Sequence, residues 1–138
     1  MEKKVEEFPE ISVGERCEIK DGKIEIPKNI LEALNLKDGD AVATILIPER
    51  KQVRLMKIDK ELYKLRIVAK DIYDTTHKLE LKLADAKVKI IHTTGFCYAK
   101  EACIWEGFLS GPDKANLEKL ADDIRQVENV FKVELKAL

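Results

Sequence analysis

Seven basic side chains in the first half of the chain are the residues best suited to bind an anion. A lysine neutralises a phosphate group as a point charge, and an arginine can also donate two parallel hydrogen bonds to it. On one surface they would predict contact with the phosphates of a nucleic acid, and the alternative is an ordinary solvated surface of mixed charge. The seven residues are Arg16, Lys20, Lys23, Lys28, Arg50, Lys51 and Arg54.

The total charge gives little support to a nucleic-acid partner. The 138 residues carry a formal net charge of -1, and the pI is about 6.2, whereas a dedicated nucleic-acid domain usually has a pI above about 9. By count, residues 16–57 hold nine lysines and arginines against seven aspartates and glutamates, and Glu18 and Glu25 flank Lys20 and Lys23. Any binding must therefore depend on where the charges lie and not on their sum.

Three cysteines and two histidines could supply metal or redox chemistry. His77, His92, Cys97 and Cys103 are soft ligands for zinc or a redox metal. Their spacing matches no metal motif, and with Cys17 they form neither a CxxC pair nor an even framework, so we predict cysteines that stay reduced and mainly buried. We predict no metal and no cofactor, and metal-dependent sensing is a weaker alternative.

Signatures of catalysis are absent from the sequence. It contains no HExxH-like pair of histidines, no phosphate-binding loop and no nucleophile elbow. The acidic pair Asp38 and Asp40 fits a turn, where carboxylates bond the local backbone. Trp105, followed by Gly107, is expected to anchor the core or an interface. We therefore predict that the protein is not an enzyme and has no catalytic residue.

Local signals in residues 17–58 predict two hairpins around one short helix. An Asp-Gly pair favours a two-residue hairpin turn, a proline after an alternating strand can begin a helix, and an asparagine after the last helical residue tolerates left-handed backbone. These signals are Asp21-Gly22, the strand Lys23–Ile26 with Pro27, the helix Lys28–Leu34 with Asn35, and the turn Lys37–Asp40. The second hairpin joins Ala41–Ile47 to Gln52–Ile58 through the turn Pro48–Lys51.

This stretch, CEIKDGKIEIPKNILEALNLKDGDAVATILIPERKQVRLMKI, resembles the AbrB/SpoVT/MazE swapped-hairpin family of DNA-binding domains. The resemblance implies that two chains interleave into one β-barrel, and that this homodimer binds double-stranded DNA. Family members usually carry arginine where Lys23 stands and another basic residue where Leu31 stands. The length also favours a partner, because about forty residues without a disulfide or metal are too few to bury a stable core.

The second half of the chain has a different pattern. Leu62–Ala69, Ala102–Leu109 and Phe131–Leu138 read as strands, Pro112–Val127 as an amphipathic helix that Asp113 can cap, and Asp74–Ala86 as a second helix. Both helices are predicted from the periodicity of their apolar residues and from their content of residues that favour helix. The order β-α-β-β-α-β predicts a four-stranded antiparallel sheet with two helices on one face, and so an α+β fold.

That order, together with DIYDTTHKLELKLADAKVKI at residues 71–90, resembles the ACT domain, a regulatory module. The resemblance implies a small-molecule effector such as an amino acid. Thr93 and Thr94 are expected to follow a buried strand and to meet the first strand–helix turn. The alternative is a domain that only packs or dimerises through its sheet edge or helices. The candidate effector residues are Asp71, Tyr73, Asp74, Thr75, Thr93 and Thr94.

These patterns predict a dimeric, cytoplasmic transcription regulator with a lead-in segment (1–16), a DNA-binding domain (17–58) and an ACT-like domain (62–138). An effector would change DNA affinity by favouring one arrangement of the dimer. The alternative is a non-DNA-binding oligomerisation or protein-interaction module, antitoxin-like or structural, with no ligand. No apolar run is long enough to span a membrane, and MEKKVEEF is too charged for a signal peptide, so no membrane partner is expected.

Overall fold

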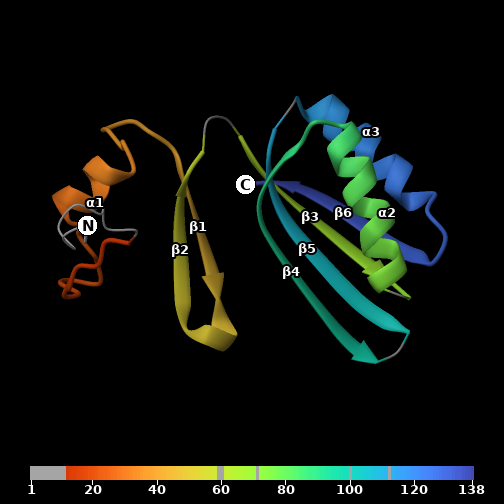
Figure 1. Cartoon of the computed structure of the whole chain (residues 1–138), viewed down its shortest axis with the longest axis horizontal. Helices are drawn as coiled ribbons and strands as arrows, with labels where there is room; N and C mark the ends of the chain where they lie inside the picture. Colours follow the sequence, from red (N-terminus) through yellow and green to blue (C-terminus); the bar gives the residue numbers. More distant parts are fainter. Residues whose placement is uncertain (1–11, 59–60, 71, 100, 112) are drawn as a thin grey trace, which may run out of the picture. The chain divides into compact units, whose positions relative to one another are not determined.

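The computed structural model describes residues 12–58, 61–70, 72–99, 101–111 and 113–138 (Figure 1). Contacts between Cα atoms divide the chain into two compact units, Met1–Asp40 and Ala41–Leu138. In a single chain the hairpin that follows Asp40 therefore groups with the C-terminal residues. The domain of residues 17–58 was predicted for two interleaved chains, and it stays a prediction.

The first hairpin turn forms where the sequence predicts it. Lys20 and Lys23 are paired as an isolated antiparallel bridge, and their backbone groups exchange two hydrogen bonds of 3.0 and 2.9 Å. Between them Asp21 and Gly22 both have positive φ, 52° and 73°. This is the geometry that a two-residue hairpin turn requires, and an Asp-Gly pair adopts it at low cost. The prediction of this turn is confirmed.

A short helix, α1 (Lys28–Ala33), follows with Pro27 at its N-cap. Its end has the geometry predicted for Asn35, whose φ is 53°. The Leu36 N–H donates to the Leu31 carbonyl at 2.9 Å, and the Asn35 N–H donates to the Glu32 carbonyl at 3.0 Å. This paired closure satisfies two carbonyls at the helix end. The predicted left-handed cap is confirmed.

The tight turn before the second hairpin uses one of the two aspartates. The Asp40 N–H donates to the Lys37 carbonyl at 3.0 Å, and the Asp40 carboxylate accepts from the Lys37 N–H at 2.9 Å. Gly39 has a φ of +90°, which a residue with a side chain rarely adopts. The carboxylate of Asp40 is thus engaged by the turn, in agreement with the structural role predicted for it.

The N-terminal unit has no core of its own among its described residues. No residue between 12 and 40 is buried. Ile19 and Ile24 are 71% and 61% exposed, although their alternation with lysine and glutamate marks one face as apolar. An apolar face of this kind is normally covered in the functional state of a protein.

The second unit begins with a β-hairpin built from β1 (Val42–Ile47) and β2 (Gln52–Lys57), joined by the 3-10 turn η2 (Pro48–Arg50). The register pairs Val42 with Lys57 and Ile47 with Gln52. Ala43 and Ile45 are buried, whereas Leu46 and Val53, a cross-strand pair on the other face, are 64% and 63% exposed. One apolar face of this hairpin is therefore buried, and its other apolar face is exposed.

The rest of the unit is a four-stranded antiparallel sheet with two helices on one face (Figure 1). The strand order is β4-β5-β3-β6, so β4 and β6 are the edges. The predicted β-α-β-β-α-β order is confirmed. The elements are β3 (Leu62–Ala69), α2 (Ile72–Asp85), β4 (Lys89–Ala99), β5 (Ala102–Ser110), α3 (Lys114–Arg125) and β6 (Val130–Ala137).

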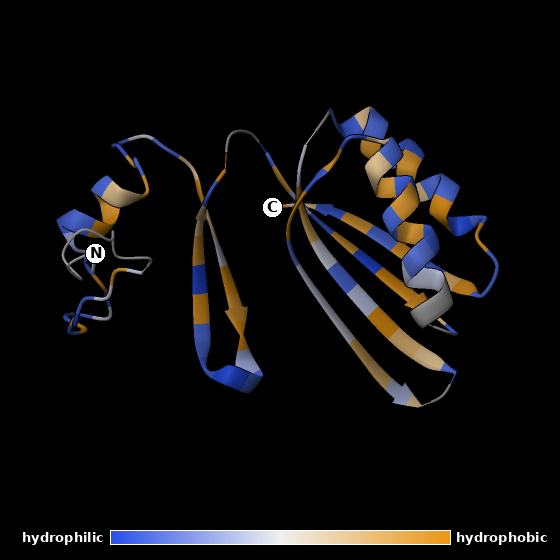
Figure 2. Cartoon of the chain, in the orientation of Figure 1, coloured by the Kyte–Doolittle hydropathy of each residue, from blue (hydrophilic) through white to orange (hydrophobic). Residues whose placement is uncertain are grey.

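The core lies between the helices and the sheet, where apolar residues alternate along β3 and recur along α3 (Figure 2). Asp113 caps α3, because its carboxylate accepts the Asn116 N–H at 2.9 Å. No described helix has the length and apolar character needed to cross a membrane. The buried cluster contains Tyr63, Leu65, Ile67, Ala69, Leu79, Leu83, Trp105, Leu109, Leu117, Leu120, Ala121, Ile124 and Val133.

Trp105 lies over Gly107 on the same face of β5, as an anchor of the core. A Cβ atom at residue 107 would lie 2.3 Å from the indole Cη2 of Trp105. Because the indole is only 8% exposed and belongs to the core cluster, it has little room to move aside.

We expect Gly107→Ala to lower the free energy of unfolding by about 1–3 kcal/mol, the usual cost of overpacking a filled core. Urea denaturation followed by Trp105 fluorescence measures it. Gly14→Ala is the matched control, because nothing lies within 4 Å of a Cβ atom there. Equal stability of the two variants would contradict the packing of Trp105 on Gly107.

Candidate functional site

Four of the seven basic residues line one hollow in the N-terminal unit. Its volume is about 780 Å³, and its polar lining comes from the hairpin turn, the chain before it and the start of α1. The other three basic residues belong to the second unit: Arg50 on η2, Lys51 between η2 and β2, and Arg54 on β2. The lining of the first hollow is Arg16, Cys17, Glu18, Lys20, Lys23, Ile24, Glu25, Ile26, Pro27 and Lys28.

Lys20 and Lys23 are held beside each other by the Asp21-Gly22 turn. Residues that are directly opposite in an antiparallel bridge project their side chains from the same face, with Cβ atoms roughly 5 Å apart. Like charges in such a pair repel each other. Among the described residues, neither lysine has an ion pair that would offset the repulsion. An anion bound between the two lysines would offset this repulsion.

Arg16 and Lys28 differ, since each has an acidic partner. Arg16 lies 3.0 Å from the Glu18 carboxylate, and Lys28 lies 3.8 Å from that of Glu32. The side chains are 62–90% exposed, and ion pairs of this kind contribute little to stability because water screens them. These two basic groups can exchange their partners for phosphate, but they carry less free positive charge than the lysine pair.

Arg54 belongs to a hydrogen-bonded chain on the second unit. Its Nη1 atom lies 3.2 Å from Nδ1 of His92, and Nε2 of His92 lies 3.0 Å from the Thr94 hydroxyl. A guanidinium only donates, so Nδ1 accepts and Nε2–H donates to Thr94. The imidazole is therefore neutral. A predicted DNA contact and a predicted effector residue are thus linked through His92.

Arg54, His92 and Thr94 border a second hollow, of about 560 Å³, between η2–β2 and β4. Arg50 and Glu49 also line it, as do the β4 residues Ile90–Gly95. Lys51 directly follows η2 and has a left-handed φ of 51°. Burial, and then the charge of Arg54, lower the pKa of His92 below its ordinary value of 6.5.

We expect NMR titration to show a pKa below 6.5 for His92 in the folded protein. The unfolded chain then binds more protons just below pH 6.5, so the stability contributed by this group falls as the pH decreases through that window. In Arg54→Ala the pKa should rise part of the way, because burial remains the larger cause. Arg50→Ala is the control and should leave it unchanged. A pKa of His92 that is insensitive to Arg54 would contradict the contact.

The predicted effector residues that the structure describes, Thr75, Thr93 and Thr94, do not form one cluster at the strand–helix turn. Asp71 lies outside the described residues, and so do the side chains of Tyr73 and Asp74. Thr75 is buried in α2, with 2% exposed. Thr93 and Thr94 do not follow a strand, because β4 continues to Ala99. That expectation was wrong: β-branched threonines favour strand, and here they extend it.

The strand register shows how far Thr94 lies from the end of β3. Thr94 pairs with Glu106, and Glu106 pairs with Arg66, three residues before the end of β3. Thr94 therefore lies two strands, or roughly 10 Å, across the sheet from β3. It faces away from the helices, whereas Thr93 faces toward them.

A groove beside α2 includes Thr93 but was not predicted as a site. Its volume is about 630 Å³, within the range of small-molecule sites. Thr76, His77 and Glu80 fall on one flank of α2, and alternate residues of β4 face them. The helical spacing of Thr76, His77 and Glu80 was the signal available in the sequence. Their relation to β4 could be recognised only once the strand register was known. The full lining is Thr76, His77, Glu80, Thr93, Gly95, Phe96, Cys97 and Trp105.

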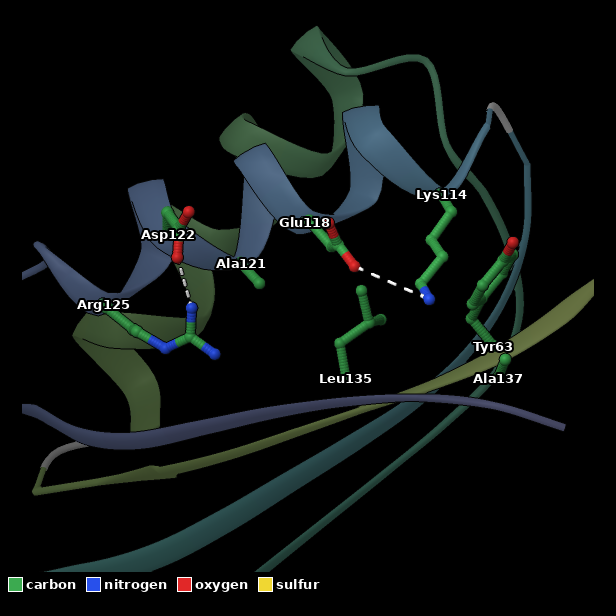
Figure 3. A pocket seen from close by; sticks show the side chains of 8 residues that line it. All are labelled: Tyr63, Lys114, Glu118, Ala121, Asp122, Arg125, Leu135 and Ala137. Carbon is green, nitrogen blue, oxygen red and sulfur yellow. Dashed lines mark hydrogen bonds and ion pairs between the residues drawn. The ribbon is translucent and has the colours of Figure 1, made fainter.

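A smaller hollow of about 330 Å³ lies between α3 and the strands β3 and β6 (Figure 3). Its charged side chains are satisfied by one another: Lys114 lies 3.9 Å from Glu118, and Arg125 pairs with Asp122. Arg125 also donates to the Val133 carbonyl at 3.1 Å. These contacts tie α3 to the edge of the sheet, which is a structural role.

Tyr63, at the end of that hollow, is buried, and its hydroxyl donates to the Glu61 carboxylate. This hydrogen bond is the largest cause that raises the pKa of Tyr63. The phenol is therefore held in its neutral form, as a donor, and has no sign of a role in proton transfer.

The cysteines differ from the prediction. Cys97 and Cys103 are joined by a disulfide with an S–S distance of 2.04 Å, and Cys17 is free and exposed. The prediction of reduced, mainly buried cysteines was wrong, because β4 and β5 bring two of them directly opposite each other. No group of three or more candidate metal ligands occurs among the described residues.

The topology of residues 62–138 defines a ferredoxin-like α+β domain. No family model matches the sequence, and no curated protein matches it. Among solved structures, it is similar to the ACT domain from GTP pyrophosphokinase of Chlorobium tepidum, with 20% identity over 56% of this chain and 100% of that one (TM-score 0.49). It is also similar to the C-terminal domain of the MgtC protein from Mycobacterium tuberculosis, with 13% identity over 56% and 87% (TM-score 0.48). The uncharacterized protein TM1266 from Thermotoga maritima is 22% identical over 58% and 99% (TM-score 0.48).

Proposed function

We propose that the protein is a cytoplasmic DNA-binding transcription regulator that works as a homodimer or higher homo-oligomer. Residues 17–58 of two chains form its DNA-binding barrel, and residues 62–138 join copies or sense a small effector. The observation that carries the proposal is the pair Lys20 and Lys23, two positive side chains held together on a turn without an ionic partner among the described residues.

Dimerisation is supported by the apolar side chains that one chain leaves open. Ile19 and Ile24 on the N-terminal unit, and Leu46 and Val53 on the hairpin, are each more than 60% exposed. Covering an isoleucine, leucine or valine side chain contributes about 1.5–3 kcal/mol. A second copy carries the same open surfaces, and a two-fold interface uses the same patch on both chains.

A two-fold dimer also strengthens the case for DNA. Each chain contributes one Lys20–Lys23 pair, so a dimer presents two such pairs, each with Arg16 and Lys28 lining the same hollow. Phosphate contacts of this kind supply affinity that does not depend on base sequence. Lysine at position 23 favours phosphate neutralisation over bidentate reading of guanine.

The edge strand β4 supports a second contact between copies. From Ile90 to Ala99 it carries no Lys, Arg, Asp or Glu, whereas the other edge, β6, carries Lys132, Glu134 and Lys136. Natural edge strands usually carry charges that prevent pairing with other chains. Phe96 and Tyr98 are 51% and 71% exposed on β4, in edge-to-face contact with a centroid distance of 4.8 Å. An uncharged strand can pair with its own copy without repulsion.

A role in effector sensing is supported by the groove beside α2. It has the size of a small-molecule site, and Thr93 offers a hydroxyl within it. Glu80 gives it a carboxylate and Trp105 an aromatic wall. This chemistry favours a ligand that carries an amino or other cationic group next to an apolar body.

Two observations favour a second function, a module that oligomerises or binds proteins without binding DNA. Glu18 and Glu32 already pair with Arg16 and Lys28. Leu31 also supplies no positive charge at the position where the resembling family has a basic residue. Titration of a mixed-sequence duplex at several salt concentrations distinguishes the two functions. Affinity that falls steeply with salt supports the regulator, and no binding at low salt supports the module.

A further inference from the structure

Cys97 and Cys103 are placed for thiol–disulfide chemistry at the exposed end of the sheet. They are directly opposite each other in the register of β4 and β5, and their Cα atoms are 3.9 Å apart. Cys97 lies on the edge strand and is exposed, whereas Cys103 is 3% exposed. One of the two residues is therefore accessible to a reagent, and the other is shielded by the domain.

The fold does not need this disulfide. The β4–β5 register already runs from Lys89 opposite Ser110 to Phe96 opposite Ile104 before it reaches the disulfide, and neither cysteine belongs to the core cluster. The two cysteines are only six positions apart. A cross-link that closes so short a loop constrains the unfolded chain least. Small domains use structural disulfides when their core is insufficient, and this domain has a core of thirteen buried residues.

We propose that Cys97 and Cys103 form a reversible redox site that exchanges with dithiols, and that its state changes the end of β4. A thiolate of the dithiol attacks Sγ of Cys97, the S–S bond breaks, and Cys103 leaves as a thiolate that takes a proton. The second thiol of the reagent then attacks the mixed disulfide and releases Cys97 as a thiol. Two electrons and two protons pass to the protein, and the dithiol becomes a disulfide.

Two features near Cys97 would respond to this exchange. Phe96 and Tyr98, its neighbours in sequence, are the exposed aromatic residues of the β4 edge. Cys97 also lines the groove beside α2 together with Trp105. The register is irregular between Cys97 and Ala99, so this end of the strand is the part that the S–S bond holds in place. Reduction frees it and alters both the edge and the groove.

The experiment counts free thiols and follows fluorescence in the full-length Cys17→Ser variant, which excludes cross-links through the third cysteine. After equilibration with oxidised glutathione we expect no free thiol per chain, and after dithiothreitol without denaturant we expect two, with full reversal. Trp105 is the one tryptophan, and its emission should change with the thiol count because a disulfide near an indole quenches it. Cys17→Ser/Cys97→Ser should show no such change.

Two results would overturn the proposal. Two free thiols after treatment with oxidised glutathione would show that the pair does not form a disulfide in solution. A disulfide that resists dithiothreitol until the protein is unfolded would show a fixed structural link. The inference does not depend on DNA binding, because both cysteines lie in the second unit and the readouts involve no nucleic acid.

Discussion

The double variant Lys20→Ala/Lys23→Ala is expected to lose most of the salt-dependent affinity for duplex DNA. Each phosphate contact contributes about 0.9 to the slope of log K against log salt. A dimer that loses four lysines should therefore have a slope smaller by about 3–4. Between 50 and 200 mM salt, the affinity of the unchanged protein should fall roughly 100-fold more than that of the variant.

Fluorescence anisotropy with a labelled mixed-sequence duplex measures this difference. Lys132→Ala/Lys136→Ala is the matched control, because it removes the same charge from β6 in the other unit. The control should keep nearly the whole slope, and thermal unfolding of both variants should match that of the parent protein. If both variants lose affinity equally, total charge and not the turn is responsible. A duplex that fails to bind the parent protein at low salt refutes the proposed function itself.

Placing charges on the two open apolar surfaces is expected to dissociate the protein stepwise. Ile24→Asp would bury a carboxylate in the proposed barrel, and Phe96→Lys would place an ammonium group at the β4 edge. Burying an unpaired charge costs several kcal/mol, and each two-fold interface contains the change twice. Each variant should therefore weaken its own contact at least about 100-fold, and the two together should give a monomer.

Light scattering coupled to size-exclusion chromatography measures the mass in solution. Val13→Asp and Phe131→Lys are matched controls, because both residues are exposed, at 51% and 62%, and lie outside the proposed contacts. They should leave the mass unchanged. A monomeric parent protein, or a double variant that keeps the parent's mass, would refute association through these surfaces. Loss of mass in Ile24→Asp alone would assign the whole interface to the N-terminal unit.

Features that depend on a few neighbouring residues were predictable from the sequence. Asp21-Gly22 forms the expected turn and Asn35 the expected left-handed cap, since both are set by backbone preferences within four residues. Asp113 caps α3 for the same reason. The β-α-β-β-α-β order also followed, because the periodicity of apolar residues is itself local.

Contacts between distant segments were not predictable in this way. Arg54 and His92 are 38 positions apart, and only the packing of the hairpin beside β4 joins them. The error at Thr93 and Thr94 has a related origin. Their sequence, followed by glycine, is compatible with a turn, but pairing with β5 extends the strand through them. A strand register is decided by two segments together, so one segment cannot reveal it.

Local signals in the sequence were sufficient to predict two kinds of segment in this protein: a lysine-rich hairpin–helix–turn region, and a β-α-β-β-α-β domain. Turn, cap and periodicity are properties of short stretches, and they survive in any context that allows them. Only the folded structure shows which groups from separate segments come into contact: Arg54 with His92, and Cys97 with Cys103. These contacts depend on strand register and on packing, and both are settled only when the whole sheet forms.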